Sequence, residues 1–142
     1  MVVRSYNILE SEAKQLLRGV GYKCRILQKK NDRQGMPFGL VAFRTSGETR
    51  YIRIRKVTRR PATMKDVAAR CDREIALYQR WLSRLQPDPV LHCEIWIFAV
   101  RTGFHCYEVL QDSIREIPTP GPKDDDRLSG IPKKPEPTGG PA

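Results

Sequence analysis

The spacing of apolar side chains changes along the chain, and the order of these changes constrains the fold more than any other feature. Over residues 6–20 apolar side chains recur every three or four positions, which predicts an amphipathic helix that ends at Gly21 in a left-handed turn. β-Rich runs then follow at residues 22–28, 40–44 and 50–56. Ser46 and Gly47 lie between the last two runs, and their turn chemistry predicts a hairpin.

A second helix and two further strands complete the pattern. Thr63 and Asp66 resemble a capping box, which opens a helix that we expect to run to about residue 85. Two β-rich runs follow at residues 92–100 and 104–110, and a turn centred on Thr102 and Gly103 would set Cys106 opposite Ala99. The order of one helix, three strands, one helix and two strands predicts an α/β fold, with a mixed sheet flanked by two helices.

The C-terminal segment differs in composition from the rest of the chain. Residues 118–142 hold seven of the 11 prolines and four of the 10 glycines, and their only larger aliphatic side chains are Leu128 and Ile131. Such a segment buries too little apolar surface to offset the entropy of ordering it. We therefore expect one folded domain over residues 1–117 and a disordered tail over residues 118–142.

The charge of the chain points to a polyanionic partner. The formal net charge is +10, and the basic and acidic residues of the tail cancel, so the surplus belongs to residues 1–117. Ten basic and only four acidic residues lie between Arg44 and Glu74. This imbalance favours a nucleic acid, most simply DNA, as partner. The sequence has no apolar run of the length of a signal peptide or membrane span, so we expect a cytoplasmic protein that does not bind a membrane.

The cysteines and histidines do not form a recognisable metal motif. The four cysteines are far apart and lie in apolar segments, which favours reduced, buried thiols. His92–Cys93 and His105–Cys106 are adjacent pairs on predicted strands, where neighbouring side chains point to opposite faces. Neither pair can then give two ligands to one metal ion, and we expect no metal or other cofactor.

Three segments together resemble a known nuclease family. The first helix ends in GVGYKCRIL, PFGLVAFRTSGETRYIRIRK follows, and EIWIFAVRTGFHCYEV comes after the second helix. In this order they resemble the PD-(D/E)xK superfamily, the fold shared by restriction endonucleases and archaeal Holliday-junction resolvases. The resemblance covers residues 5–117 and implies a restriction-endonuclease-like core of the order α-β-β-β-α-β-β.

The residues that the family uses for catalysis are replaced in this chain. Active members hold a divalent metal with an acidic residue at the start of the second strand and with a Glu-x-Lys motif on the third. The corresponding positions are Gly39, Arg53 and Arg55. Arginine stays protonated and cannot ligate a metal, but it binds phosphate well. The resemblance thus implies that these positions converge in one cleft beside the first helix, in a domain that binds DNA without cutting it.

The candidate binding residues are arginines and one lysine near the third strand. Arg53 and Arg55 share one face of that strand. Instead of binding phosphate, they could form ion pairs within the protein with Glu10, Glu12 or Glu74. Arg80 and Arg84, farther along the second helix, suit a solvated face equally well. The residues that we expect to contact phosphates are Arg53, Arg55, Lys56, Arg59 and Arg60, followed by Arg44, Arg70 and Arg73.

Two other functions remain open at this point. The first is a metal-dependent DNA endonuclease with a displaced site built from Glu10, Glu12 or Glu48. The second is an interaction subunit that forms a homodimer or pairs with an active nuclease homologue. The aromatic residues of the second helix and the last two strands, which include Trp81 and Trp96, are interpreted as core rather than as base-stacking groups.

Overall fold

The computed structural model describes residues 6–27 and 38–120 of the 142-residue chain. Residues 121–142, which make up most of the expected tail, lie outside the described residues, as does Gln28 at the end of the first predicted strand. The elements in chain order are α1 (Tyr6–Gly19), β1 (Lys23–Ile26), β2 (Leu40–Phe43), β3 (Thr49–Val57), α2 (Met64–Arg70), α3 (Asp72–Ser83), β4 (Leu91–Ala99), β5 (Gly103–Val109) and β6 (Ile114–Ile117).

The strands form one mixed sheet. Within the described residues it has six strands in the order β1-β2-β3-β4-β5-β6. Only the β3–β4 pair is parallel, and each of the other neighbouring pairs is antiparallel. A parallel pair needs a crossover connection, which α2 and α3 supply. The predicted α/β class with a mixed sheet is therefore confirmed.

Helix α1 ends where the sequence predicts. Gly21 adopts a left-handed conformation with φ of 97°. The N–H of Tyr22 donates to the carbonyl of Leu17 at 3.0 Å, and the N–H of Gly21 donates to the carbonyl of Arg18 at 3.1 Å. This pair of bonds is a Schellman motif, which satisfies carbonyls at the end of the helix.

The hairpin between β2 and β3 is also confirmed. Gly47 has φ of 98° in the turn, and the N–H of Arg44 donates to the carbonyl of Glu48 at 2.9 Å. The glycine supplies a backbone conformation that a side chain would disfavour.

The second helix is divided, which corrects the prediction of a single long helix and of two flanking helices. Thr63 caps α2 as expected, since its Oγ1 accepts from the N–H of Asp66 at 3.1 Å. The backbone leaves the helical conformation at Cys71, with φ of −112° and ψ of 20°, and α3 begins at the next residue. The described part of the chain therefore has three helices.

The last strands differ from the prediction in register and number. Gly103, with φ of 86°, pairs with Ala99, so the turn spans residues 100–102. The predicted pairing of Cys106 with Ala99 is wrong, because this earlier turn sets Cys106 opposite Trp96. Strand β6 was not predicted; it is a short strand with exposed charges, as is common at a sheet edge.

Two hydrophobic clusters cover the two faces of the sheet. On one face, which we call the α1 face, α1 packs Leu9, Ala13 and Leu17 against Ile52 and Ile54 of β3. On the other, which we call the α3 face, Tyr78 packs with Ile95, Ile97 and Val109. The Tyr78 hydroxyl also donates to the carbonyl of Tyr51 at 2.8 Å, which ties α3 to β3.

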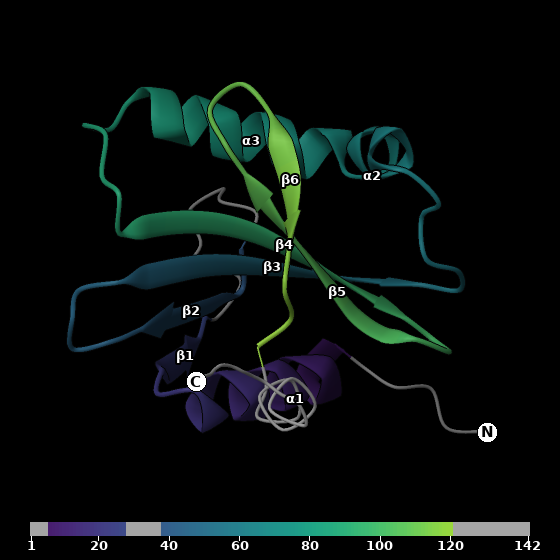
Figure 1. Ribbon diagram of the computed structural model, residues 1–142, viewed down its shortest axis with the longest axis horizontal. Helices are drawn as coiled ribbons and strands as arrows, with labels where there is room; N and C mark the ends of the chain where they lie inside the picture. Colours follow the sequence, from purple (N-terminus) through teal and green to yellow (C-terminus); the bar gives the residue numbers. More distant parts are fainter. Residues whose placement is uncertain (1–5, 28–37, 121–142) are drawn as a thin grey trace, which may run out of the picture.

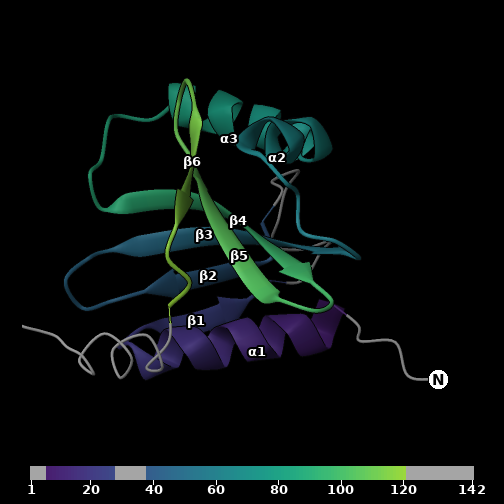
Figure 2. The ribbon, with the colours of Figure 1, turned by 45° about the vertical axis from the view of Figure 1, so that its right-hand side comes forward.

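The helices lie over different parts of the sheet. Helix α1 packs against β1, β2 and β3, whereas α3 packs against β5 and reaches β3 through the side chains of Tyr78, Trp81 and Glu74. Both views show this offset, with α1 beside β1 and with α2 and α3 on the far side of β4 (Figures 1 and 2). None of the helices in residues 6–27 and 38–120 is both long and apolar enough to cross a membrane.

Candidate functional site

Arg53 and Arg55 share one carboxylate on the α3 face. Nη1 of Arg55 lies 2.7 Å from Oε2 of Glu74, and Nε of Arg53 lies 3.7 Å from the same oxygen. Glu74 is buried on the first turn of α3. The internal pairing that the sequence left open is therefore present for Glu74. It is incomplete for Arg53, because Nε of this side chain has no hydrogen-bond partner among the described residues.

The break between α2 and α3 brings the backbone carbonyl of Arg70 to Arg55. Nη1 of Arg55 also donates to the carbonyl of Arg70, the last residue of α2, at 3.3 Å. Burial raises the pKa of the nearby Cys71 thiol, and the positive charges of Arg55, Arg53 and Arg70 oppose this shift. We call Arg53 and Arg55, which share Glu74, the arginine cluster; Arg70 itself is exposed at the end of α2.

The arginine cluster does not lie beside the first helix, which corrects the cleft implied by the nuclease resemblance. Period-two alternation on β3 sends Ile52 and Ile54 to α1 and therefore sends Arg53 and Arg55 to the opposite face. Gly39 is next to Arg53, as expected, because its N–H donates to the carbonyl of Ile52 at 3.0 Å. Glu10 and Glu12 lie on α1, which covers the other face.

Three other predicted residues lie near the ends of the elements that hold the cluster. Arg59 is exposed in the loop after β3, and Arg73 is exposed on α3, one residue before Glu74. Arg60 is exposed as well, and its Nη2 lies 2.7 Å from Oε2 of Glu116 on β6. Arg80 and Arg84 are exposed toward the end of α3, as a solvated helix face would be.

Arg44 and Lys56 lie away from the cluster. Arg44 stands at the β2–β3 turn, where its Nη2 donates to the carbonyl of Val20 at 2.6 Å and its guanidinium lies 4.1 Å from the centre of the Tyr22 ring. Lys56 follows Arg55 on β3 and is paired in register with Phe98, which packs on the α1 face. The predicted set of phosphate-binding residues is thus split between two faces.

A polar cluster that the sequence did not predict lies on the α1 face. Glu94 on β4 is 2% exposed, and Glu108, its cross-strand partner on β5, is 6% exposed. Both interrupt otherwise apolar strands, which is the signal that could have identified them. A carboxylate at a buried strand position requires hydrogen-bond donors nearby.

Glu94 receives one donor from its own strand and one from the neighbouring β3. The indole Nε1 of Trp96 donates to Oε1 of Glu94 at 2.8 Å, and Nη1 of Arg50 donates to the same oxygen at 3.3 Å. Arg50 also donates through Nε to the hydroxyl of Tyr22 at 3.0 Å. Burial raises the pKa of Glu94, and Arg50 and Trp96 oppose this shift.

Glu108 is held between a histidine and an arginine. Nδ1 of His92 lies 2.8 Å from Oε2 of Glu108, and Nη2 of Arg115 donates to Oε1 at 2.8 Å. The hydrogen bond with His92 lowers the pKa of Glu108, and the same bond raises the pKa of His92. On the other side, Nε2 of His92 lies 3.6 Å from Oε2 of Glu48.

The carboxylates of the polar cluster have hydrogen-bond partners within the sheet. They are engaged by Arg50, Trp96, His92 and Arg115. Among the residues that the structure describes, no three His, Cys, Asp or Glu side chains come together as metal ligands. The contacts of Glu48 with Arg44 and His92 give no support to the displaced metal site considered for this residue.

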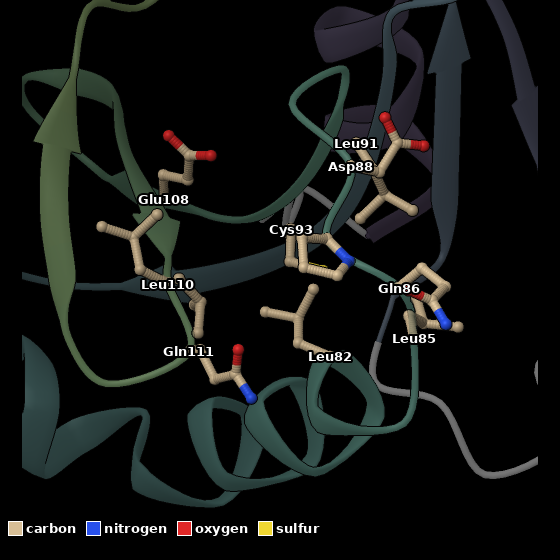
Figure 3. A pocket seen from close by; sticks show the side chains of 11 residues that line it. Leu82, Leu85, Gln86, Asp88, Leu91, Cys93, Glu108, Leu110 and Gln111 are labelled. Atoms are coloured by element: carbon tan, nitrogen blue, oxygen red, sulfur yellow. The ribbon is translucent and has the colours of Figure 1, made fainter.

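A small pocket lies at the other end of α3. It has a volume of about 180 Å³ and is formed by the end of α3, the loop before β4 and the turn after β5. Figure 3 shows Leu82 and Cys93 near its middle, with Leu110 and Leu85 on opposite sides. None of the arginines and lysines predicted to bind phosphate lines this pocket.

A search of the sequence against models of protein families, and another against curated proteins, found no match.

Proposed function

We propose that this chain is a catalytically inactive nuclease-like domain that binds DNA through phosphate contacts. The observation that carries the proposal is the arginine cluster, in which Arg53 and Arg55 share the single carboxylate of Glu74. A phosphate group would add negative charge beside these two guanidinium groups. Guanidinium groups suit this role because their N–H groups match the geometry of phosphate oxygens.

The hydrogen bonding of Arg53 supports the same proposal. Among the described residues, Nε of Arg53 is a buried donor without a hydrogen-bond partner, because Glu74 is too distant at 3.7 Å. Both arginine side chains are partly open to solvent: 30% of the Arg53 side chain and 28% of the Arg55 side chain are exposed. A phosphate oxygen that reaches Arg53 would therefore meet a donor, Nε, that the described residues do not satisfy.

The charge of the domain supports a nucleic acid over a small anion. The net charge of +10 spreads well beyond the cluster, and Arg59 and Arg73 are exposed close to it in the sequence. Several cations along one surface release several counterions from DNA, which strengthens binding at low salt. The proposal rests on this charge more than on the nuclease resemblance, since the cluster faces α3 and not α1.

The proposed lack of catalysis rests on the residues at the family's metal positions. Gly39 has no side chain, and Arg53 and Arg55 are cations, so these three positions offer no oxygen ligand to a divalent metal. Cleavage of DNA by the purified chain in Mg²⁺ or Mn²⁺ would contradict this part of the proposal.

The direct test is a salt titration of DNA binding. We expect Arg53→Gln and Arg55→Gln each to weaken binding and to reduce the slope of log K against log salt by about one. Arg84→Gln is the matched control, because it removes the same charge from an exposed position at the far end of α3. If the Arg53/Arg55 double variant keeps the affinity and slope of the parent chain, the proposed site is wrong.

A further inference from the structure

The α3 face of β1, β2 and β3 carries a row of basic and aromatic side chains. Val41 on β2 packs on this face, and Phe43, two residues farther along β2, points the same way. Lys23 is the register partner of Phe43, and Arg25 is the partner of Val41. Lys23 and Arg25 therefore lie on the same face as Arg53 and Arg55 of the arginine cluster.

Residues 6–27 and 38–120 cover this part of the face only partly. Phe43 is 41% exposed, and Lys23 and Arg25 are exposed beside it. The reason is the offset between the helices, since α1 packs on the other side of these strands and α3 packs over β5 and part of β3 (Figures 1 and 2). We call Lys23, Arg25, Phe43, Tyr51, Arg53 and Arg55 the open sheet face.

One aromatic residue of this face lies on the same strand as the arginines, and the other lies on the neighbouring strand. Tyr51 precedes Arg53 by two residues on β3, and it is half-buried. Its ring packs edge-on against Trp81 of α3, with the ring centres 5.0 Å apart. Tyr51 is thus held by α3, whereas Phe43 on the neighbouring strand is 41% exposed.

We propose that the open sheet face binds single-stranded DNA, with bases stacked on Phe43 and phosphates held by Lys23, Arg25, Arg53 and Arg55. This inference rests on the proposed DNA binding and adds the form of DNA that the site selects. A sheet surface that combines an exposed aromatic ring with cations suits a single strand, because each unpaired base offers a face for stacking.

Duplex DNA does not use this combination of residues. Its base faces are stacked inside the helix, so Phe43 would meet only sugars and phosphates. The cations would still attract the duplex backbone, which gives non-specific binding at low salt. The aromatic side chain of Phe43 therefore distinguishes the two forms of DNA, and the arginines do not.

The test compares an oligothymidylate with a duplex of the same length, for the parent chain and for Phe43→Leu. We expect the parent chain to bind the single strand more tightly. Phe43→Leu should weaken single-strand binding about tenfold, the loss of one stacked base, and leave duplex binding and the salt slope unchanged. Val100→Ala is the control, because it trims an apolar side chain that is 57% exposed in the β4–β5 turn.

Tryptophan fluorescence gives a second readout of the same site. Trp81 touches Tyr51, so a base bound on this face should quench its emission, and Trp81→Phe should remove most of the quenching. Trp96 is fully buried on the α1 face and should contribute little to the signal.

The outcomes separate this inference from the proposed function. If neither form of DNA binds, or if the Arg53 and Arg55 variants bind as the parent does, the proposed function itself fails. If both forms bind through the arginines with equal affinity, or if Phe43→Leu binds the single strand as the parent does, only the single-strand inference is overturned.

Discussion

Arg55 on β3 and Glu74 on α3 form an ion pair of 2.7 Å that joins the sheet to the helix above it. The same carboxylate lies 3.7 Å from Arg53, so it competes with any phosphate that approaches the two arginines. Glu74 therefore contributes to the stability of the fold and limits the affinity of the proposed site at the same time.

Glu74→Gln should separate these two effects. The amide keeps the size of the side chain but removes its charge, so DNA binding should become several times tighter and more sensitive to salt. The free energy of unfolding should fall by about 1 kcal/mol, because a partly buried ion pair is lost. Binding titrations and urea unfolding measure the two quantities. Weaker DNA binding by a folded Glu74→Gln variant would contradict the competition.

Glu94 should matter more to stability than an exposed carboxylate does. Glu94→Ala removes the acceptor of the Trp96 indole N–H and leaves the partly buried Arg50 without its counter-charge. We expect a loss of about 3 kcal/mol in the free energy of unfolding, measured with urea. Asp112→Asn, at an exposed position before β6, should change it by less than about 0.5 kcal/mol. Equal losses in the two variants would show that the polar cluster does not stabilise the sheet.

The His92–Glu108 pair should make stability depend on pH. The hydrogen bond raises the pKa of His92 above its ordinary 6.5, so its stabilising effect is complete below 6.5 and is lost as the pH rises through the folded-state value. The same bond lowers the pKa of Glu108 below its ordinary 4.5, so that contribution is present above 4.5 and is lost as the pH falls through the folded-state value. The pair should stabilise the fold most between these two ordinary values.

His92→Gln isolates this effect. The parent chain should lose stability relative to the variant as the pH rises from 6 to 9, which thermal unfolding at a series of pH values would show. Parallel curves for the two chains over this range would mean that His92 is not charged in the folded protein.

The four thiols should differ in reactivity. Cys71, Cys93 and Cys106 are buried, and burial raises the pKa of Cys93 to about 12. Cys24 is half-buried, and burial raises its pKa less, against the opposing charges of Arg18 and Lys14. A thiol reagent added to the native protein should label one cysteine quickly, and Cys24→Ser should abolish this phase. Rapid labelling of two or more thiols would contradict the burial of the other three.

Local patterns in the sequence were enough to identify most of the elements. The helical spacing of α1, the left-handed Gly21 and the Ser46–Gly47 turn depend on residues close to one another in the chain, and each is found where it was predicted. The sequence likewise placed Arg53 and Arg55 on one strand face, opposite Ile52 and Ile54, because a strand alternates with period two.

Only the tertiary structure decided whether Arg53 and Arg55 lie on the α1 face or on the α3 face. The choice between α1 and α3 depends on which helix packs against Ile52 and Ile54, and on Glu74, which is 19 residues from Arg55. The polar cluster likewise unites Glu94, Glu108 and His92 from β4 and β5 with Arg50 from β3. Composition and local spacing therefore determined a basic α/β chain, whereas strand pairing and helix packing, which act between distant residues, determined where its charges meet.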